Sequence, residues 1–279
     1  MTDHRKGDSA GFPWEGRTFD HHDTEYKDDD GSIPPEFRDA MLVLRERGVL
    51  AAETDALAAV VDALREARLL VPLVAEAGEV GTTPEGKVVD KTQELSIPTV
   101  AGPDGAPILP VFSSASAMRV WNPKARPVPA SAQRVAVAAL EEDAQRVVID
   151  AGSDATELVL AAPALRAIAA GAPWRPAYRV SEVTDAIRAA AAEVRSAAAV
   201  AIVPGDPQSR LHGAELMIVF VTADEAATRS ELQGFTQQLA SSEAVALLVA
   251  AVRVSLYPLG EQGIDVEFPP GSLVARLQN

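Results

Sequence analysis

The residue types that usually carry catalysis are scarce in this chain of 279 residues. It contains no cysteine, which excludes disulfides, thiolate nucleophiles, iron–sulfur clusters and every cysteine-ligated zinc site. No Gly-x-Ser-x-Gly elbow activates a serine. His21 and His22 are adjacent, and neighbouring side chains of an extended segment point to opposite sides, so they do not form a metal-binding pair. We therefore expect no catalytic residues, no metal site and no cofactor.

Two segments come close to ligand-binding motifs and fail at defined positions. Gly81 to Val88 fits G-x-x-x-x-G-K, but Val88 stands where a hydroxyl must bind magnesium, and the following residues read as extended rather than helical. Asp28 to Asp30 precede Gly31 as in a calcium loop, yet the first and twelfth ligand positions would fall on Tyr26 and Phe37. Both segments are interpreted as loops.

Carboxylates offer the remaining route to catalysis. Asp150 follows a predicted strand, which is where α/β proteins often place catalytic groups. The sequence after it, Ala151-Gly152-Ser153, favours a turn instead. An enzyme that acts on a small metabolite through Asp90 and Asp150 with Lys91 stays an alternative hypothesis, although the sequence alone does not show that any two of these residues lie together.

The charge pattern indicates a binding face more directly. The net charge is −15, yet no acid occurs between Asp104 and Glu141. Tryptophan and arginine are enriched where protein interfaces concentrate their energy. We predict a face that binds a protein partner or a small anionic ligand, unless these bases pair with the chain's own acids and the tryptophan packs in the core. The candidate binding residues are Arg119, Trp121, Lys124, Arg126 and Arg134.

A second window repeats this pattern. Between Leu158 and Ser181 the chain again has no acid, and it carries Arg166, Arg175 and Arg179 close to Trp174.

The hydrophobic pattern predicts an α+β fold with two mixed α/β domains, each a small sheet flanked by helices. The first domain should contain helices from Pro35 and after an N-cap at Thr54, strands over 69–74, 95–100 and 107–112, and a helix capped by Ser114. Prolines in these strands suggest sheet edges or bulges. A helix capped by Ser131, strands over 147–149 and 158–160, and a helix from Pro163 to Gly171 should follow.

Residues 172–176 are rich in proline and mark the predicted domain boundary. Beyond them we expect a helix over 182–195, strands over 200–203 and 216–221, and a helix with a capping box from Thr222 to Glu225. Strands over 251–256 and 264–268 should complete the second sheet. The predicted parts are an acidic flexible arm over residues 1–39, a first domain over 40–171 and a second domain over 172–279.

The composition excludes some classes of binding partner and indicates where the protein is located. A strongly acidic chain lacks the lysine and arginine excess that binds polyphosphates, so general nucleic-acid binding is not expected. The sequence shows neither a signal-peptide pattern nor an apolar run of membrane-spanning length. The expected location is the cytoplasm, with no membrane association.

Several segments together resemble the SseB family as it occurs in actinobacteria. They are Leu69 to Val74, Asp90 to Pro98, Leu109 to Ser114 with Trp121, and Gly11 to Arg17. The resemblance covers roughly residues 10–170 and extends more loosely to the remainder.

This resemblance implies a cytoplasmic α+β protein of a family named for enhanced sensitivity to serine, without established catalytic residues. Some relatives are linked by name to a rhodanese-like sulfurtransferase, but a chain without cysteine can only assist such an enzyme. We expect a non-catalytic regulatory or adaptor protein that modulates serine or sulfur metabolism through a protein partner. A homo-oligomeric scaffold built by pairing sheet edges is a further alternative.

Overall fold

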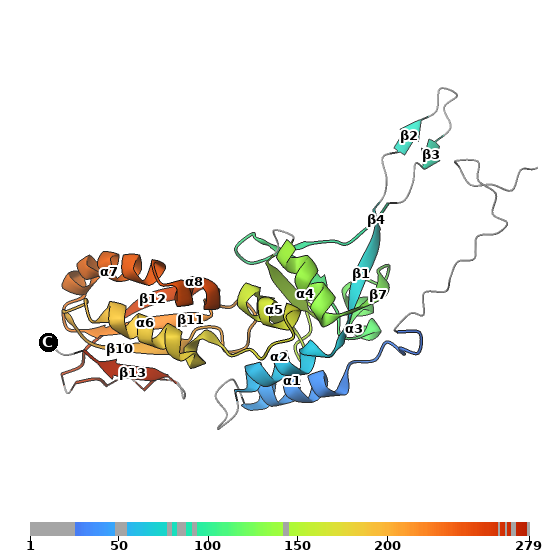
Figure 1. The fold of residues 1–279 in the computed structure, drawn as a ribbon. Coiled ribbons are helices and arrows are strands. Elements are labelled where there is room, and N and C mark those ends of the chain that lie inside the picture. The colour runs from blue at the N-terminus through green and yellow to red at the C-terminus, as the bar shows by residue number, and fades with distance from the viewer. Residues whose placement is uncertain are drawn as a thin grey trace, which may run out of the picture. The chain divides into compact units, whose positions relative to one another are not determined.

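The fold is α+β, as the sequence predicts, in a computed structural model that covers the whole chain (Figure 1). The chain divides into two units, residues 1–30 and residues 31–279. Of the first unit the structure describes only a turn, in which Asp29 N–H donates to Tyr26 O. The described residues are 26–47, 55–76, 80–82, 88–90, 94–141, 145–261, 263–265, 267–268 and 272–277.

Two small sheets meet in the first half of the second unit. One has the order β4-β1-β7 and the other β5-β6-β8-β9, and a bridge between Leu70 and Phe112 connects them. The β6–β8 pair is parallel, while the other neighbours in these two sheets are antiparallel. A separate hairpin joins β2 and β3. The strands are β1 (Arg68–Glu76), β2 (Val80–Thr82), β3 (Val88–Asp90), β4 (Glu94–Ser96), β5 (Val100–Ala101), β6 (Pro107–Val111), β7 (Arg126–Ser131), β8 (Arg146–Ile149) and β9 (Leu158–Ala161).

In the described part of this half there are five helices, and most of their predicted ends are confirmed. Ser114 caps α3 by accepting from Ala117 N–H, and Ser131 accepts from Arg134 N–H at the start of α4. The cap of α2 was predicted one residue too early, because Asp55 rather than Thr54 accepts from the first-turn amides. The helices are α1 (Pro35–Arg47), α2 (Ala56–Arg65), α3 (Ala115–Trp121), α4 (Ala132–Glu141) and α5 (Ala162–Ala169).

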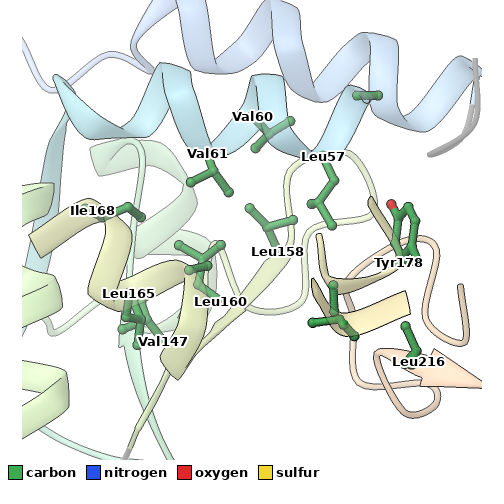
Figure 2. Close-up of a cluster of buried hydrophobic side chains, with 14 of the residues drawn as sticks. Leu57, Val60, Val61, Val147, Leu158, Leu160, Leu165, Ile168, Tyr178 and Leu216 are labelled. Carbon is green, nitrogen blue, oxygen red and sulfur yellow. The ribbon is translucent and has the colours of Figure 1, made fainter. Parts of the chain in front are cut away.

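Successive side chains of the strands point to opposite faces of the sheet and so form two separate core clusters. Side chains such as Val147, Leu158 and Leu160 pack towards α2 and α5, where Val61 and Leu165 meet them (Figure 2). The intervening positions Ile108, Val148 and Val159 form a second cluster on the opposite face. Each strand is therefore buried on both sides, which explains its nearly continuous apolar sequence.

Pro72 lies in a central strand, where a proline is unexpected. Leu70 exchanges backbone hydrogen bonds with Phe112, and β4 begins to pair with β1 only at Val74. The backbone nitrogen of Pro72 faces the same side of β1, in the gap between Phe112 and β4. No described strand pairs with β1 in this gap, so the missing N–H of proline costs no hydrogen bond. The prediction of a sheet edge or a bulge at this proline was wrong, because β1 pairs with β7 in an unshifted register and a gap on its other side needs no donor from Pro72.

The end of β8 is tied to the start of α3 by a buried carboxylate. Asp150 is buried, and its two oxygens accept from Ser113 N–H at 2.7 Å and from the Ser113 hydroxyl at 2.5 Å. Its backbone adopts φ of 51°, a left-handed conformation that aspartate tolerates. Ser113 O in turn accepts from Arg68 at 2.8 Å. This network fixes the direction in which the chain leaves β6 and enters α3.

The second half contains one sheet with helices against it. The sheet has the order β12-β11-β10-β13, with a parallel β11–β12 pair. Val200 and Ile218 belong to the same core cluster as Ile187 of α6 and Phe235 of α7, so these helices share one face of the sheet. Phe220 meets Phe235 edge to face, with ring centroids 5.0 Å apart. The elements are α6 (Ser181–Ala191), β10 (Ala197–Pro204), β11 (Leu216–Thr222), α7 (Glu225–Ala240), α8 (Glu243–Leu248), β12 (Val252–Pro258) and β13 (Leu273–Arg276).

Three predictions in this half were wrong in detail. Asp224, not Thr222, caps α7, because Thr222 still pairs in β11 and its hydroxyl donates to backbone carbonyls. The helix predicted over 182–195 ends at Ala191. The last strand is β13 rather than residues 264–268, of which the described positions are not in a strand.

The loop between β10 and β11 contacts the first half directly. Ser209 O accepts from Val159 N–H and its hydroxyl donates to Val159 O, each at 2.7 Å, so the loop pairs with β9. Arg210 donates to the carbonyls of Ser153 and Asp154. Leu211 packs on the cluster around Val159.

The hydrophobic core also continues from one half to the other. It includes Leu57 and Leu158 together with Tyr178 and Leu216 (Figure 2). The domain boundary placed at residue 172 stays a prediction. The predicted arm overlaps α1 by residues 35–39, and its residues 1–25 lie outside the described part of the chain.

We expect Asp150→Ala to lower the free energy of unfolding by about 2–4 kcal/mol, because two buried donors of Ser113 lose their acceptor. Asp150→Asn should lower it much less, since asparagine keeps a carbonyl acceptor and tolerates the left-handed backbone. Urea-induced unfolding of both variants measures the difference. Equal stability of the two variants would contradict this role of the carboxylate.

Candidate functional site

Trp121 lies at the end of α3 as part of a small core. Its ring packs against Phe112 with centroids 5.2 Å apart, and both residues contact the cluster of Leu70 and Met118. The side chain is half-buried. Trp121 therefore holds α3 against β1 and presents only part of its ring to a partner.

The outer side of α3 carries exposed side chains. Met118 and Trp121 are three residues apart and face inward, which turns Arg119 and Val120 outward. Val120 is 87% exposed. Lys124 follows in an exposed turn in which the Asn122 side chain accepts from Lys124 N–H. We call Arg119, Val120 and Lys124 the α3 patch.

Val120 was not among the predicted site residues, although the helical periodicity of the sequence indicates that its side chain faces solvent. With Met118 and Trp121 inward, the residue between Arg119 and Trp121 must face solvent. An apolar side chain in that position is what the sequence reasoning missed.

The register of β7 places Arg126 away from this patch. Arg126 pairs with Leu73 and Val128 with Val71, whereas Leu70 and Pro129 are opposite each other. Side chains of directly paired residues share a face, and successive residues alternate. Since α3 packs on Leu70, Arg126 leaves β7 on the opposite face of the sheet.

Arg134 is also separate from the patch. It lies exposed in the first turn of α4, beyond the far end of β7. The five residue steps of β7 span about 17 Å. Of the predicted basic residues, Arg119 thus lies on α3 and Lys124 in the turn that follows it, whereas Arg126 and Arg134 lie elsewhere.

The alternative to a binding face was that these bases form ion pairs with the chain's own acids and that Trp121 packs in the core. Arg119 donates to Ala115 O within its helix at 3.2 Å. Among the described residues, none of the predicted bases forms an ion pair with an acid, whereas Arg65, Arg146 and Arg188 do. The described structure thus supports the packing half of the alternative, for Trp121, and not the pairing half.

The groups considered for catalysis lie in structural roles where they are described. Asp150 is engaged by Ser113, and burial raises the pKa of its carboxyl above the ordinary value. Asp90 ends β3, while Lys91 lies outside the described residues. Val88 pairs with Thr82 in a hairpin, so the P-loop-like segment does not open a helix. Over the residues that the structure describes, no group of three potential ligands is placed to hold a metal ion.

A cavity lies beside the β10–β11 loop, between β9, the 174–178 segment and the start of β12. Its volume is about 80 Å³, which is room for a few water molecules and not for an ordinary metabolite. Asp206 and Glu215 line it, and burial raises the pKa of both carboxyl groups. Two backbone amides occupy the Glu215 oxygens, from Ala177 at 3.3 Å and from Ala250 at 2.8 Å. Glu215 therefore fastens two chain segments rather than binding a substrate.

Comparison with known families bears on the half that carries the α3 patch. Residues 45–167 match the family model of the SseB protein N-terminal domain. These residues therefore form an SseB N-terminal domain. The SseB domain runs from Arg45 in α1 to Ala167 in α5 and contains α3 and β7, while residues 168–279 lie outside the match. The actinobacterial type stays a prediction.

The other comparisons are negative. No curated protein and no solved structure matches the chain. Within the described residues, no helix is both long and apolar enough to cross a membrane.

The buried Glu215 generates a pH prediction. Because burial raises its pKa above 4.5, the fold favours the protonated form, so the stabilisation is complete below about pH 4.5 and is lost as the pH rises through the folded-state pKa. Glu215→Gln should remove this loss. The free energy of unfolding of the wild type minus that of Glu215→Gln should therefore fall as the pH rises above about 4.5, by no more than about 1.4 kcal/mol per pH unit.

Urea unfolding of both proteins at several pH values measures this difference, in which the contributions of Asp150 and Asp206 cancel. A difference that stayed flat or grew with pH would show that the amide hydrogen bonds outweigh the cost of burying the charge.

Proposed function

We propose that this chain is a non-catalytic binding protein of the SseB family that recognises an acidic protein surface through the α3 patch. The observation that carries the proposal is the exposure of Val120 between two bases that form no ion pair with a described acid. Such a combination is typical of an interface, because the apolar side chain gains by burial and the bases select the partner. In a chain of net charge −15, unpaired bases are the unusual feature.

The neighbouring strand favours binding through side chains. Leu70 forms its backbone bonds with Phe112, so the paired position Pro129 directs its backbone away from β1, and Pro127 does the same two residues earlier. Both positions would otherwise present N–H groups at the edge. Prolines there remove the donors that an added strand needs.

The alternative of an enzyme that uses carboxylates receives less support. Asp150 would need to release Ser113 before it could act on a substrate, and the cavity beside the β10–β11 loop is too small for one. A homo-oligomeric scaffold, a small anionic ligand, a cytoplasmic location and a link to serine or sulfur metabolism stay predictions. Because the chain has no cysteine, any sulfur transfer would depend on the partner.

The test is affinity purification of the tagged chain from cells that express it, compared with the double variant Arg119→Glu/Lys124→Glu. We expect the wild type to recover an acidic partner. The variant should recover at least about tenfold less of this partner, because two attractive charges become repulsive. Recovery should also fall as salt is raised.

Two controls separate the α3 patch from charge in general. Arg188→Glu/Arg253→Glu makes the same change in net charge at exposed sites in the other half and should leave recovery unchanged. Arg126→Glu should also leave it unchanged, because Arg126 lies on the opposite face of the sheet. If the Arg119/Lys124 variant recovered the same partners as the wild type, the proposed function would be wrong.

A further inference from the structure

A groove runs between α5 and α8 and joins the SseB domain to the second half of the chain. Its volume is about 560 Å³, within the range of peptide and ligand sites. Arg166 on α5 donates to Leu247 O on α8 at 2.5 Å, so the two walls are linked. The lining consists of Pro163, Arg166, Ala167, Pro173, Trp174, Arg175, Val180, Leu247 and Leu248.

The apolar part of the groove is left open. Leu247 is 50% exposed and Leu248 is 38% exposed, and α8 has no buried residue. A helix on a sheet normally turns its large apolar side chains inward. Here two leucines beside the half-buried Trp174 form an uncovered surface of the kind that marks interaction sites.

The charges of the groove all have one sign. Arg166 and Arg175 line it, no acid does, and neither arginine forms an ion pair with an acid that the structure describes. Arg166 is held in place by its bond to Leu247 O, so its remaining donors have a fixed position. Residues of the second acid-free window, 158–181, thus line the same groove as α8, although α8 lies about 70 residues further along the chain.

We propose that the α5–α8 groove binds an acidic peptide segment of a partner protein, with one apolar side chain on Trp174, Leu247 and Leu248 and carboxylates towards Arg166 and Arg175. Charge complementarity selects this occupant, since guanidinium groups bind carboxylates with two parallel hydrogen bonds. Tryptophan and arginine are also the residue types that concentrate binding energy at protein interfaces. This site goes beyond the α3 patch and does not depend on it.

The test uses a random library of twelve-residue peptides displayed on phage and selected on the full-length protein. We expect the selected peptides to be enriched in aspartate and glutamate around one large apolar residue. Their synthetic versions should bind at least about tenfold more weakly to Arg175→Glu and to Leu247→Ser, measured by fluorescence polarisation. Both positions are exposed, so circular dichroism should show that the variants remain folded.

Further variants keep this result distinct from the α3 patch. Arg119→Glu/Lys124→Glu should bind the selected peptides like the wild type, and so should Arg188→Glu, which removes a base outside the groove. Peptides without acidic enrichment, no enrichment at all, or peptides that bind Arg175→Glu unchanged would each overturn the proposal. Loss of binding in the Arg119/Lys124 variant instead would assign the peptides to the α3 patch.

Discussion

One buried carboxylate controls how the SseB domain presents its surface. Asp150 accepts two hydrogen bonds from Ser113, and through this residue it fixes the angle between the end of β6 and α3. The orientation of α3 decides which side chains face the core around Phe112 and which face solvent. The α3 patch thus depends on a residue that the sequence presents as a candidate for catalysis. Its hydrogen bonds offset only part of the cost of burying the carboxylate, because the pKa of Asp150 is still raised.

The two halves of residues 31–279 are held by different kinds of interaction. The β10–β11 loop adds polar contacts at β9 through Ser209, and Glu215 ties the start of β12 to the segment that follows Trp174. The shared core adds apolar burial around Tyr178. The α5–α8 groove requires both halves to be in place, because each supplies one wall.

The local parts of this structure could be predicted from the sequence, and the long-range ones could not. The caps at Ser114 and Ser131 follow from hydrogen bonds within four residues, so they could be predicted. The separation of Arg126 from Arg119 depends on strand register, and no local pattern fixes the register here. Trp174 and Arg175 stood out in the sequence, but their neighbour Leu247 did not, because only tertiary packing brings α8 beside α5.

The two prolines of β7, Pro127 and Pro129, have a consequence for aggregation at high protein concentration. An edge strand normally invites other chains to continue the sheet, and such growth has no natural end. At Pro127 and Pro129 the outward backbone offers no donor, and Arg126 adds charge beside them. The sheet can therefore end at β7 without this edge becoming a starting point for aggregation.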